Sequence, residues 1–414
     1  MLCQLHSKPH LKRESALLAV FLLLSAILFT IPTGFEERVA KKTVRSKGRI
    51  INTDNSEVHQ RGIIRTGDQG VTVKILNGPF KGSVVKGNNP LLGQMDLDKI
   101  FEVGDTALVV LSLTEEGEIS FVNPQQHYRL GLEIFLLCMF ALALIAFGGW
   151  TGAKALFSFI FSALMIWKIL VPFMLKGYDP VLLSLGVVAL LTGVVIFLVA
   201  GLTKKGMVAF LGAFLGVLTS CLMALYFTSR FHVHGAVLPF AETLLYSGFA
   251  HLNLTKIYVA AVFIAASGAV MDLAMDVAAS MNEVVSKRKD ITTLEAIGSG
   301  FSVGRAVVGT MTTTLLLAYS GGYITLVMAF MAQGVPLTNL FNLIYVAAEV
   351  LKTVVGSFGL VMVAPFTAVV GGFVFCGKKT EIKDSPILLS KQNPLTSQIK
   401  FKAIGSYRKA NTNQ

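Results

Sequence analysis

The stretch GAVMDLAMDVAASMNE, residues 268–283, carries two aspartates four positions apart in a segment otherwise apolar enough to cross a bilayer. Positions four and seven apart share one face of a helix. The face that carries both acids comprises Gly268, Asp272, Asp276, Ala279 and Glu283. A carboxylate at bilayer depth costs about 3 kcal/mol even on lenient insertion scales, so it normally faces a partner, a cavity or a pathway. The stretch therefore indicates a membrane helix with a polar site.

The composition places this helix in a chain with many membrane crossings. Of 414 residues, 53% are hydrophobic and 14% are charged, whereas about a quarter of the residues in soluble domains are charged. The net charge of +12 is concentrated in short loops and in the C-terminal region, where it indicates topology and contact with anionic lipid. No aromatic and basic surface accompanies it. We therefore expect the lipid bilayer as the environment, and no nucleic-acid partner.

Eight segments are candidates for membrane spans. The first, residues 16–33, follows a charged start like that of a signal peptide, but no A-x-A cleavage pattern follows, which favours an uncleaved anchor. Seven further apolar segments have spanning length, namely residues 130–148, 153–175, 181–202, 207–228, 256–281, 307–331 and 340–375. The last is too long for a plain crossing. Its Gly356, Gly359 and Pro365 indicate either a kinked helix or an added re-entrant piece.

The distribution of Lys and Arg predicts the orientation. A cytoplasmic N-terminus, residues 1–15, places the loops at 204–205 and 287–289 and the tail on the same side, as the positive-inside rule requires. We expect a multi-pass protein of the cell membrane with both termini in the cytoplasm. The predicted regions are spans two to five at 130–228, an external loop with an interfacial helix at 229–255, spans six to eight with the polar site at 256–376, and a disordered basic tail at 377–414. A separate short cytoplasmic helix is expected at 290–300, with Thr292 as its cap.

Residues 34–129 form a polar insert between the first two spans. The runs at 70–76 and 107–113 have strand character, and NGPFKG at 77–82 and TEEGE at 114–118 are turn signals. Short strands between glycine turns favour a small all-β domain of OB or SH3 type outside the cell. Such a domain would bind a ligand or an envelope partner, or would serve only as a structural cap.

Intramembrane polar residues gather in the last third of the chain. Span six holds Asp272 and Asp276, span seven contributes Arg305 and Thr313, and span eight contributes Asn342, Glu349 and Lys352. We predict one polar seam between these three helices. The glycines expected to let the helices approach closely are Gly268, Gly309, Gly356 and Gly359.

The chemistry of this seam suggests a cation or a proton. Asp272, Asp276 and Glu349 would provide the binding oxygens, with Asn342 and Thr313 beside them, and Arg305 or Lys352 would neutralise the empty site. Oxygen ligands suit a hard divalent cation, Na⁺ or a proton, and Asp272, Asp276 and Glu349 are the candidate metal ligands. The structural alternative is an acid–base network that only holds the helices together. No cofactor is otherwise indicated.

Three long motifs resemble those of a known family. They are GAVMDLAMDVAASMNEV (268–284), SVGRAVVGTMTTTLLLAYSG (302–321) and AAEVLKTVVGSFGLVMVAPFTA (347–368). Together they resemble the YibE/F-like family of bacterial membrane proteins, and the likeness extends more loosely over the insert and spans two to five. Ala306 and Thr313 stand where the family tends to carry aspartate and asparagine. The resemblance implies a multi-pass architecture and a bacterial membrane location more than an activity.

Two functional hypotheses follow. The first is a transporter or permease with an intramembrane carboxylate site for a hard cation or a proton-coupled solute. The second is a non-transporting scaffold or signalling protein that acts through its external β-domain, as a homo-oligomer or with an envelope partner. No Ser–His–Asp, HExxH or CxxC arrangement and no phosphate-binding loop is present, so we expect no enzymatic activity.

Overall fold

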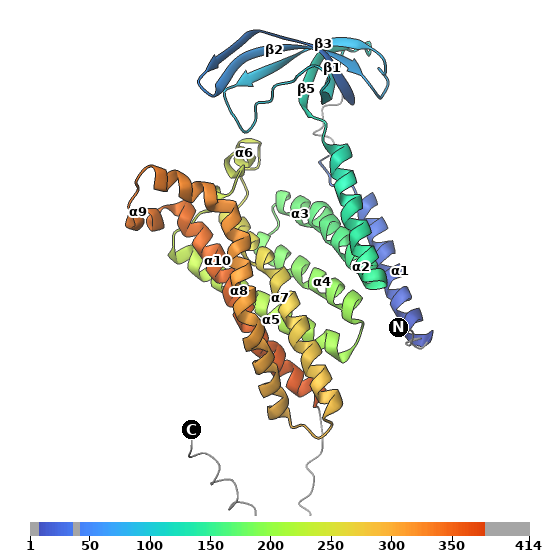
Figure 1. The fold of residues 1–414 in the computed structure, drawn as a ribbon, viewed down its shortest axis with the longest axis vertical. Coiled ribbons are helices and arrows are strands. Elements are labelled where there is room, and N and C mark those ends of the chain that lie inside the picture. The colour runs from blue at the N-terminus through green and yellow to red at the C-terminus, as the bar shows by residue number, and fades with distance from the viewer. Residues whose placement is uncertain (1–7, 36–41, 377–414) are drawn as a thin grey trace, which may run out of the picture.

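A computed structural model of the chain describes residues 8–35 and 42–376 (Figure 1). It has two parts, a five-stranded β-sheet and a helical bundle, and the sheet lies beyond one end of the bundle (Figure 1). The first seven residues and the predicted disordered tail, residues 377–414, lie outside the described residues.

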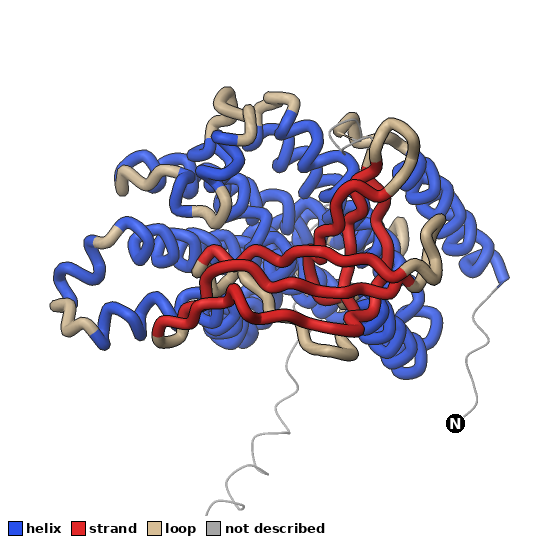
Figure 2. The backbone as a smooth tube through the Cα atoms, turned by 90° about the horizontal axis from the view of Figure 1, so that it is seen from above, coloured by secondary structure: helices blue, strands red, loops and turns tan. Residues whose placement is uncertain are grey.

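The β-sheet closes into a partly open barrel, as the sequence predicts. Its strands are β1 (Thr43–Arg61), β2 (Ile64–Ile75), β3 (Val84–Leu92), β4 (Thr106–Leu113) and β5 (Ile119–His127). They pair antiparallel in the order β3-β2-β1-β4-β5. Figure 2 shows them in red as one strongly curved sheet. The two edge strands also meet, because a Cβ on Gly87 of β3 would lie 2.6 Å from the carbonyl oxygen of Val122 of β5. Glycine at residue 87 thus allows the edges to approach.

Strands β1 and β3 were not expected from the sequence. Much of β1 beyond Ile50 is exposed, so its sequence lacks the apolar alternation that marks β2.

The interior of the barrel also contains a buried polar residue, Gln69, whose side chain hydrogen-bonds to the backbone of Phe101, a residue outside the strands. Its Nε2 donates to the carbonyl oxygen of Phe101 at 2.9 Å, and its Oε1 accepts from the Phe101 amide at 3.0 Å. Asn89 Nδ2 donates to the same Oε1 at 3.1 Å.

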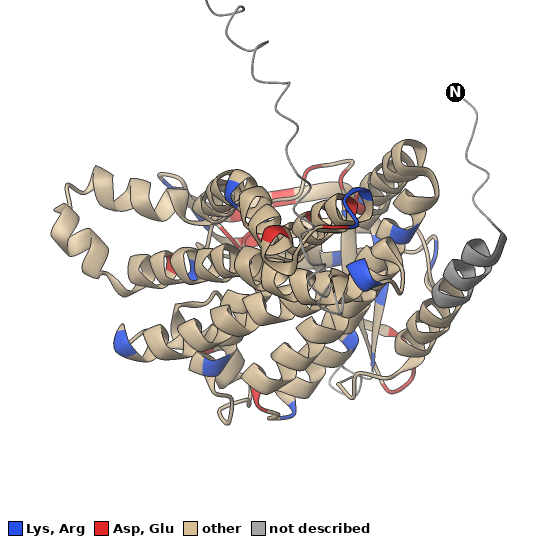
Figure 3. Ribbon diagram, turned by 90° about the horizontal axis from the view of Figure 1, so that it is seen from below, with Lys and Arg blue, Asp and Glu red and all other residues tan. Residues whose placement is uncertain are grey.

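Helices make up the rest of the described chain. They are α1 (Lys8–Thr30), α2 (Leu130–Met165), the π-turn η2 (Ile166–Leu170), α3 (Val171–Leu175), α4 (Pro180–Ala200), α5 (Lys204–Arg230), the 3₁₀ turn η3 (Gly235–Val237), α6 (Ala241–Tyr246), α7 (Leu254–Lys287), α8 (Thr293–Ala332), α9 (Leu337–Asn342) and α10 (Ile344–Phe375). Among the described residues, six helical stretches are long and apolar enough to cross a membrane, and Leu18–Thr30 is a shorter apolar helix. Charged residues are sparse along them, as the mostly tan ribbon of Figure 3 shows.

The longest of these stretches, Leu130–Leu175, is bent back on itself at Gly149. Gly149 has φ 53° and ψ −128°, a conformation that only glycine adopts without strain. A Cβ on Gly152 would lie 2.1 Å from the carbonyl oxygen of Leu144, and the rings of Phe140 and Phe159 are 5.8 Å apart. In a straight helix, residues 19 positions apart would be separated by about 28 Å. The stretch is therefore a hairpin, whose arms correspond to the predicted segments 130–148 and 153–175.

Helices α5, α7 and α10 pack most closely and form the centre of the bundle. Gly359 of α10 sits directly on α5, where a Cβ would lie 1.9 Å from Ser220 Oγ and 2.8 Å from the carbonyl oxygen of Gly216. Small residues at this contact let the two backbones approach and gain dispersion contacts. The glycines of α5 that make this contact were not singled out in the sequence.

Two helix boundaries differ from the sequence prediction. Thr292 and Glu295 do form a capping box, but it opens the 40-residue helix α8 instead of a separate short helix at 290–300. The final apolar segment divides at Leu343, which has an extended backbone (φ −68°, ψ 131°). The extra length is accommodated by the short helix α9, and α10 then continues through Pro365 without interruption.

Candidate functional site

The two aspartates lie on the outward face of α7. Asp272 and Asp276 are exposed on the surface of the bundle, as is Gly268 on the same helix face. Val270, Leu273 and other apolar residues on the opposite face of α7 are completely buried. Burial of the Val, Leu and Ala face against α5 and α10 turns the acidic face away from them. The helical spacing of the acids is thus as predicted, but the surface they meet differs.

A groove of about 400 Å³ runs along this acidic face. It is lined by Val195, Ile196 and Val199 of α4, by Met271, Asp272, Met275 and Asp276 of α7, and by Met311 of α8. Within the described part of the chain, neither carboxylate accepts a hydrogen bond or forms an ion pair. Two acids therefore share one groove without a basic partner.

Three methionines also line this groove, which sequence reasoning missed. Met271 and Met275 are four positions apart, so their thioethers share a face adjacent to the acids, and Met311 approaches from α8. The spacing of the first two was visible in the sequence, whereas the approach of the third was not. The groove thus has thioether sulfur beside the carboxylate oxygens.

The predicted seam between α7, α8 and α10 is not assembled. Glu349 lines a different cavity, with Lys352, and does not join Asp272 and Asp276. The described residues contain no group of three or more His, Cys, Asp or Glu placed to hold a metal ion, so the site of three carboxylates is not formed. The reason is depth: Asp272 lies about 27 Å along α7 and Glu349 about 8 Å along α10, and both helices start at the end near the barrel (Figure 1).

The remaining polar candidates line neither cavity. Thr313 of α8 is exposed, and its hydroxyl donates to the carbonyl oxygen of Gly309 at 3.0 Å. Asn342 is the last residue of α9, off the α10 face to which it was assigned, and its amide donates to the Thr338 carbonyl at 2.7 Å. Arg305 is exposed on α8 and, among the residues described, forms no ion pair, so it does not neutralise the acids.

The four predicted packing glycines divide into two pairs. Gly356 and Gly359 are buried in helix contacts, with Gly356 facing Ala266 of α7. Gly268 and Gly309 face open space, since a Cβ at either would meet no atom within 4 Å. The sequence pattern therefore identified only the packing glycines of α10.

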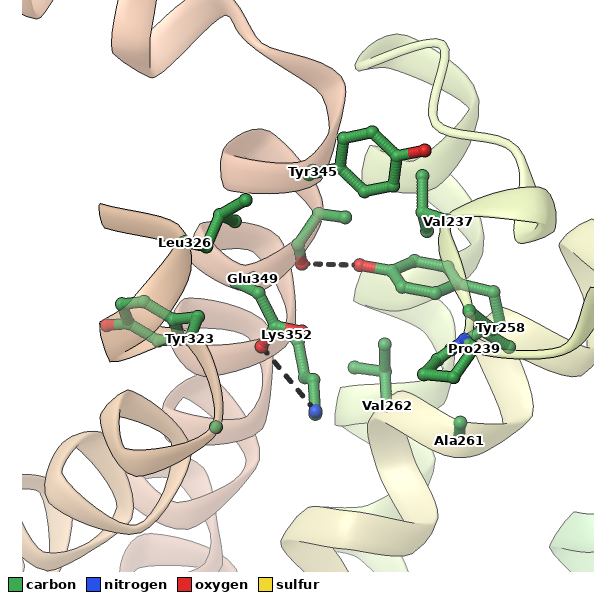
Figure 4. Close-up of a pocket in the computed structure, with 13 residues that line it drawn as sticks. Val237, Pro239, Tyr258, Ala261, Val262, Tyr323, Leu326, Tyr345, Glu349 and Lys352 are labelled. Carbon is green, nitrogen blue, oxygen red and sulfur yellow. Dashed lines mark hydrogen bonds and ion pairs between the residues drawn. The ribbon is translucent and has the colours of Figure 1, made fainter. Parts of the chain in front are cut away.

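The second cavity has a volume of about 360 Å³ and lies near the starts of α7 and α10, at the end of the bundle closest to the barrel (Figure 1). Figure 4 shows the side chains that line it. Its walls come from α7, α8, α10 and the loop around η3. The Glu349 carboxylate and the Lys352 ammonium face it and are 3.5 Å apart. The hydroxyl of Tyr258 donates to the carbonyl oxygen of Ala348 at 2.6 Å on the adjacent wall. The cavity thus combines an ion pair with mostly apolar walls.

Comparison with known proteins identifies the family. The model for the family described as YibE/F-like protein matches residues 136–377, which is more than half of the chain. This chain belongs to the YibE/F-like family. No curated protein and no solved structure matches it. Both cavities lie within the matched residues, whereas the barrel precedes them. The two cavities, and not the barrel, thus belong to the part that defines the family.

Proposed function

We propose that this member of the YibE/F-like family is a membrane permease in which Asp272 and Asp276 bind a cation or a proton. The observation that carries the proposal is that two acids one helical turn apart line one groove without a basic partner among the described residues. Side chains four apart on a helix are about 6 Å from each other, so two ionised carboxylates repel. A bound proton or cation reduces the repulsion between the two carboxylates, and it also reduces the free-energy cost of their negative charge in an apolar surrounding.

The proposed ion is a hard cation, Na⁺ or a divalent ion, or a proton that drives a solute. Carboxylates bind such ions well, and a carboxylate pair can take up a single proton. The groove lies between α4, α7 and α8, so a movement of α4 or α8 relative to α7 would change its access. Alternating exposure of such a site is what a permease requires.

The proposed arrangement in the cell membrane has eight crossings. These are α1, the two arms of the hairpin at Gly149, α4, α5, α7, α8 and α10. The start of α5, with Lys204-Lys205, and the connection from α7 to α8, with Lys287-Arg288-Lys289, lie at the end of the bundle opposite the barrel (Figure 1). Positive loops favour the cytoplasm, which supports cytoplasmic termini and an extracytoplasmic barrel.

Flux measurements on the full chain in proteoliposomes test this proposal. The panel consists of Na⁺, Mg²⁺, Mn²⁺ and Ca²⁺, together with a pH-sensitive dye for protons. Asp272→Asn and Asp276→Asn remove charge at nearly constant volume, and we expect each to abolish the flux seen with the wild type. Glu283→Gln is the matched control, because Glu283 is on the same stripe but pairs with Lys287 at 2.6 Å outside the groove.

Size-exclusion profiles show whether each variant still folds. Wild-type flux in either Asn variant would refute the assignment of the aspartates. If the wild type carries neither protons nor any of the four cations, the proposal of a permease for these ions is refuted.

A second candidate function, a non-transporting scaffold or signalling protein, is favoured by the surface of the barrel. Ile63 and Met95 are 78% and 68% exposed and line one groove of the barrel, which lies outside the candidate membrane spans. Exposed apolar clusters mark contact sites for partners. The proposed partner is an envelope component or a second copy, and neither candidate function is enzymatic. In a strain that lacks the gene for this protein, Ile63→Glu with Met95→Glu should then fail to restore the wild-type behaviour, while Asp272→Asn should restore it; the opposite pattern would exclude the scaffold.

A further inference from the structure

The Glu349–Lys352 cavity holds two opposite charges whose hydrogen-bonding capacity is unused. The two groups are an ion pair at 3.5 Å, and in the described part of the chain neither makes a hydrogen bond to any other residue. A carboxylate accepts about four hydrogen bonds and an ammonium donates three. Their side chains are 31% and 29% exposed, and they face the cavity (Figure 4). Both groups are therefore available to a ligand.

The walls of this cavity are partly aromatic. Tyr258, Tyr323 and Tyr345 line the cavity from three different helices (Figure 4). The Tyr258 hydroxyl is held by the Ala348 carbonyl. The ring of Tyr319 lies 5.1 Å from Lys352 Nζ, a cation–π contact that restrains the ammonium. Such walls provide apolar contact and leave the two charges as the groups that orient a ligand.

The charges decide which class of ligand fits. A ligand with one charge would satisfy one member of the pair and leave the other without its partner in an apolar surrounding, which is strongly unfavourable. A ligand with both charges exchanges one ion pair for two. The volume of about 360 Å³ is at the small end of ligand cavities, which range from about 300 to 1,000 Å³. The opposite charges and the size together select a small zwitterion.

We propose that this cavity binds a small zwitterion that carries a primary ammonium and an acidic group, with the ammonium at Glu349 and the acidic group at Lys352. Free amino acids and the headgroup of an ethanolamine phospholipid share this chemistry. The site is separate from the Asp272–Asp276 groove, so the inference goes beyond the proposed ion binding. If the chain is a permease, this cavity is the site for the solute.

Binding to the full chain tests the proposal without measuring transport. The protein is purified into nanodiscs of phosphatidylcholine and phosphatidylglycerol, and binding is followed by calorimetry and by the shift in Tm. The soluble probes are the standard amino acids, with matched amines that lack the carboxylate and matched acids that lack the amine. A second set of nanodiscs contains phosphatidylethanolamine. A shift only in the second set would assign the site to the lipid headgroup, and a response to a soluble probe would assign it to an amino acid.

We expect at least one zwitterion to bind, and its singly charged analogues to bind at least tenfold more weakly. Glu349→Gln and Lys352→Gln should each weaken binding at least tenfold. Lys256→Gln is the matched control, because Lys256 pairs with Asp179 at 2.5 Å at the same end of the bundle but does not line the cavity. This control should bind as the wild type does.

Three outcomes would overturn the proposal. They are the absence of binding by every zwitterion in both nanodisc sets, equal binding of an analogue that lacks one charge, and unchanged binding in either Gln variant. If the Gln variants lower Tm without ligand, the comparison of each zwitterion with its singly charged analogues on the wild-type chain decides the proposal. The failure of ion flux through the Asp272–Asp276 groove would leave these outcomes unaffected.

Discussion

Replacement of Gly359 by alanine tests the contact that positions α10, the helix that carries Glu349 and Lys352. A Cβ at residue 359 would lie 1.9 Å from Ser220 Oγ and 2.8 Å from the carbonyl oxygen of Gly216. The serine hydroxyl can rotate, but the carbonyl belongs to the backbone of α5, so the two helices would have to separate. Overpacking of this kind costs about 1–3 kcal/mol. Alanine regains up to about 1 kcal/mol through its higher helix propensity.

We therefore expect Gly359→Ala to lower the free energy of unfolding by about 1–2 kcal/mol. Gly309→Ala is the matched control, because a Cβ there meets no atom within 4 Å and only the propensity gain remains. The control should be neutral or more stable than the wild type by up to about 1 kcal/mol. Adding Ser220→Ala to Gly359→Ala should restore part of the lost stability, since it removes the nearest oxygen and leaves the Gly216 carbonyl in place.

The assay is denaturant unfolding in detergent micelles, followed by fluorescence and by size-exclusion chromatography. Equal stability of Gly359→Ala and Gly309→Ala would refute the close approach of α5 and α10. A full rescue by Ser220→Ala would show that the Gly216 backbone does not limit the approach.

Three further predictions concern single polar groups. Asp179 caps α4 and accepts a hydrogen bond from Lys256, which with the α4 backbone amides holds the pKa of its carboxyl below the ordinary 3.8. The ionised Asp179 carboxylate contributes to the free energy of unfolding above about pH 4, and this contribution is lost as the pH falls through the lowered pKa. Asp179→Ala should therefore cost about 1 kcal/mol at pH 7 and less near pH 2, as measured by thermal unfolding at both pH values. Tyr258→Phe removes the hydrogen bond to Ala348 and should cost about 1 kcal/mol by the same assay. Gln69→Leu leaves the polar groups of Phe101 and Asn89 without their hydrogen-bond partner inside the barrel, so we expect the free energy of unfolding to fall by about 3 kcal/mol. An unchanged Tm would contradict the buried network.

The sequence by itself determined the features that depend on local chemistry. Apolar length predicted the long apolar helices. The alternation in 70–76 and the apolar, β-branched run at 107–113 predicted strands β2 and β4, and the Thr292–Glu295 pair predicted a helix start. The helical spacing of Asp272 and Asp276 also predicted correctly that they share a face. Each of these follows from neighbours within a few positions along the chain.

Only the tertiary structure decided what that face meets. Periodicity predicts which residues of a helix lie together, but neither which helix packs against them nor at what depth. The burial of the Val270 face of α7 against α5 and α10 turns the aspartates towards α4. The early position of Glu349 in α10 places it far from them in depth. These two facts divide the expected single polar site into an acidic groove and an ion-paired cavity, because packing and helix registry are set by contacts between residues distant in sequence.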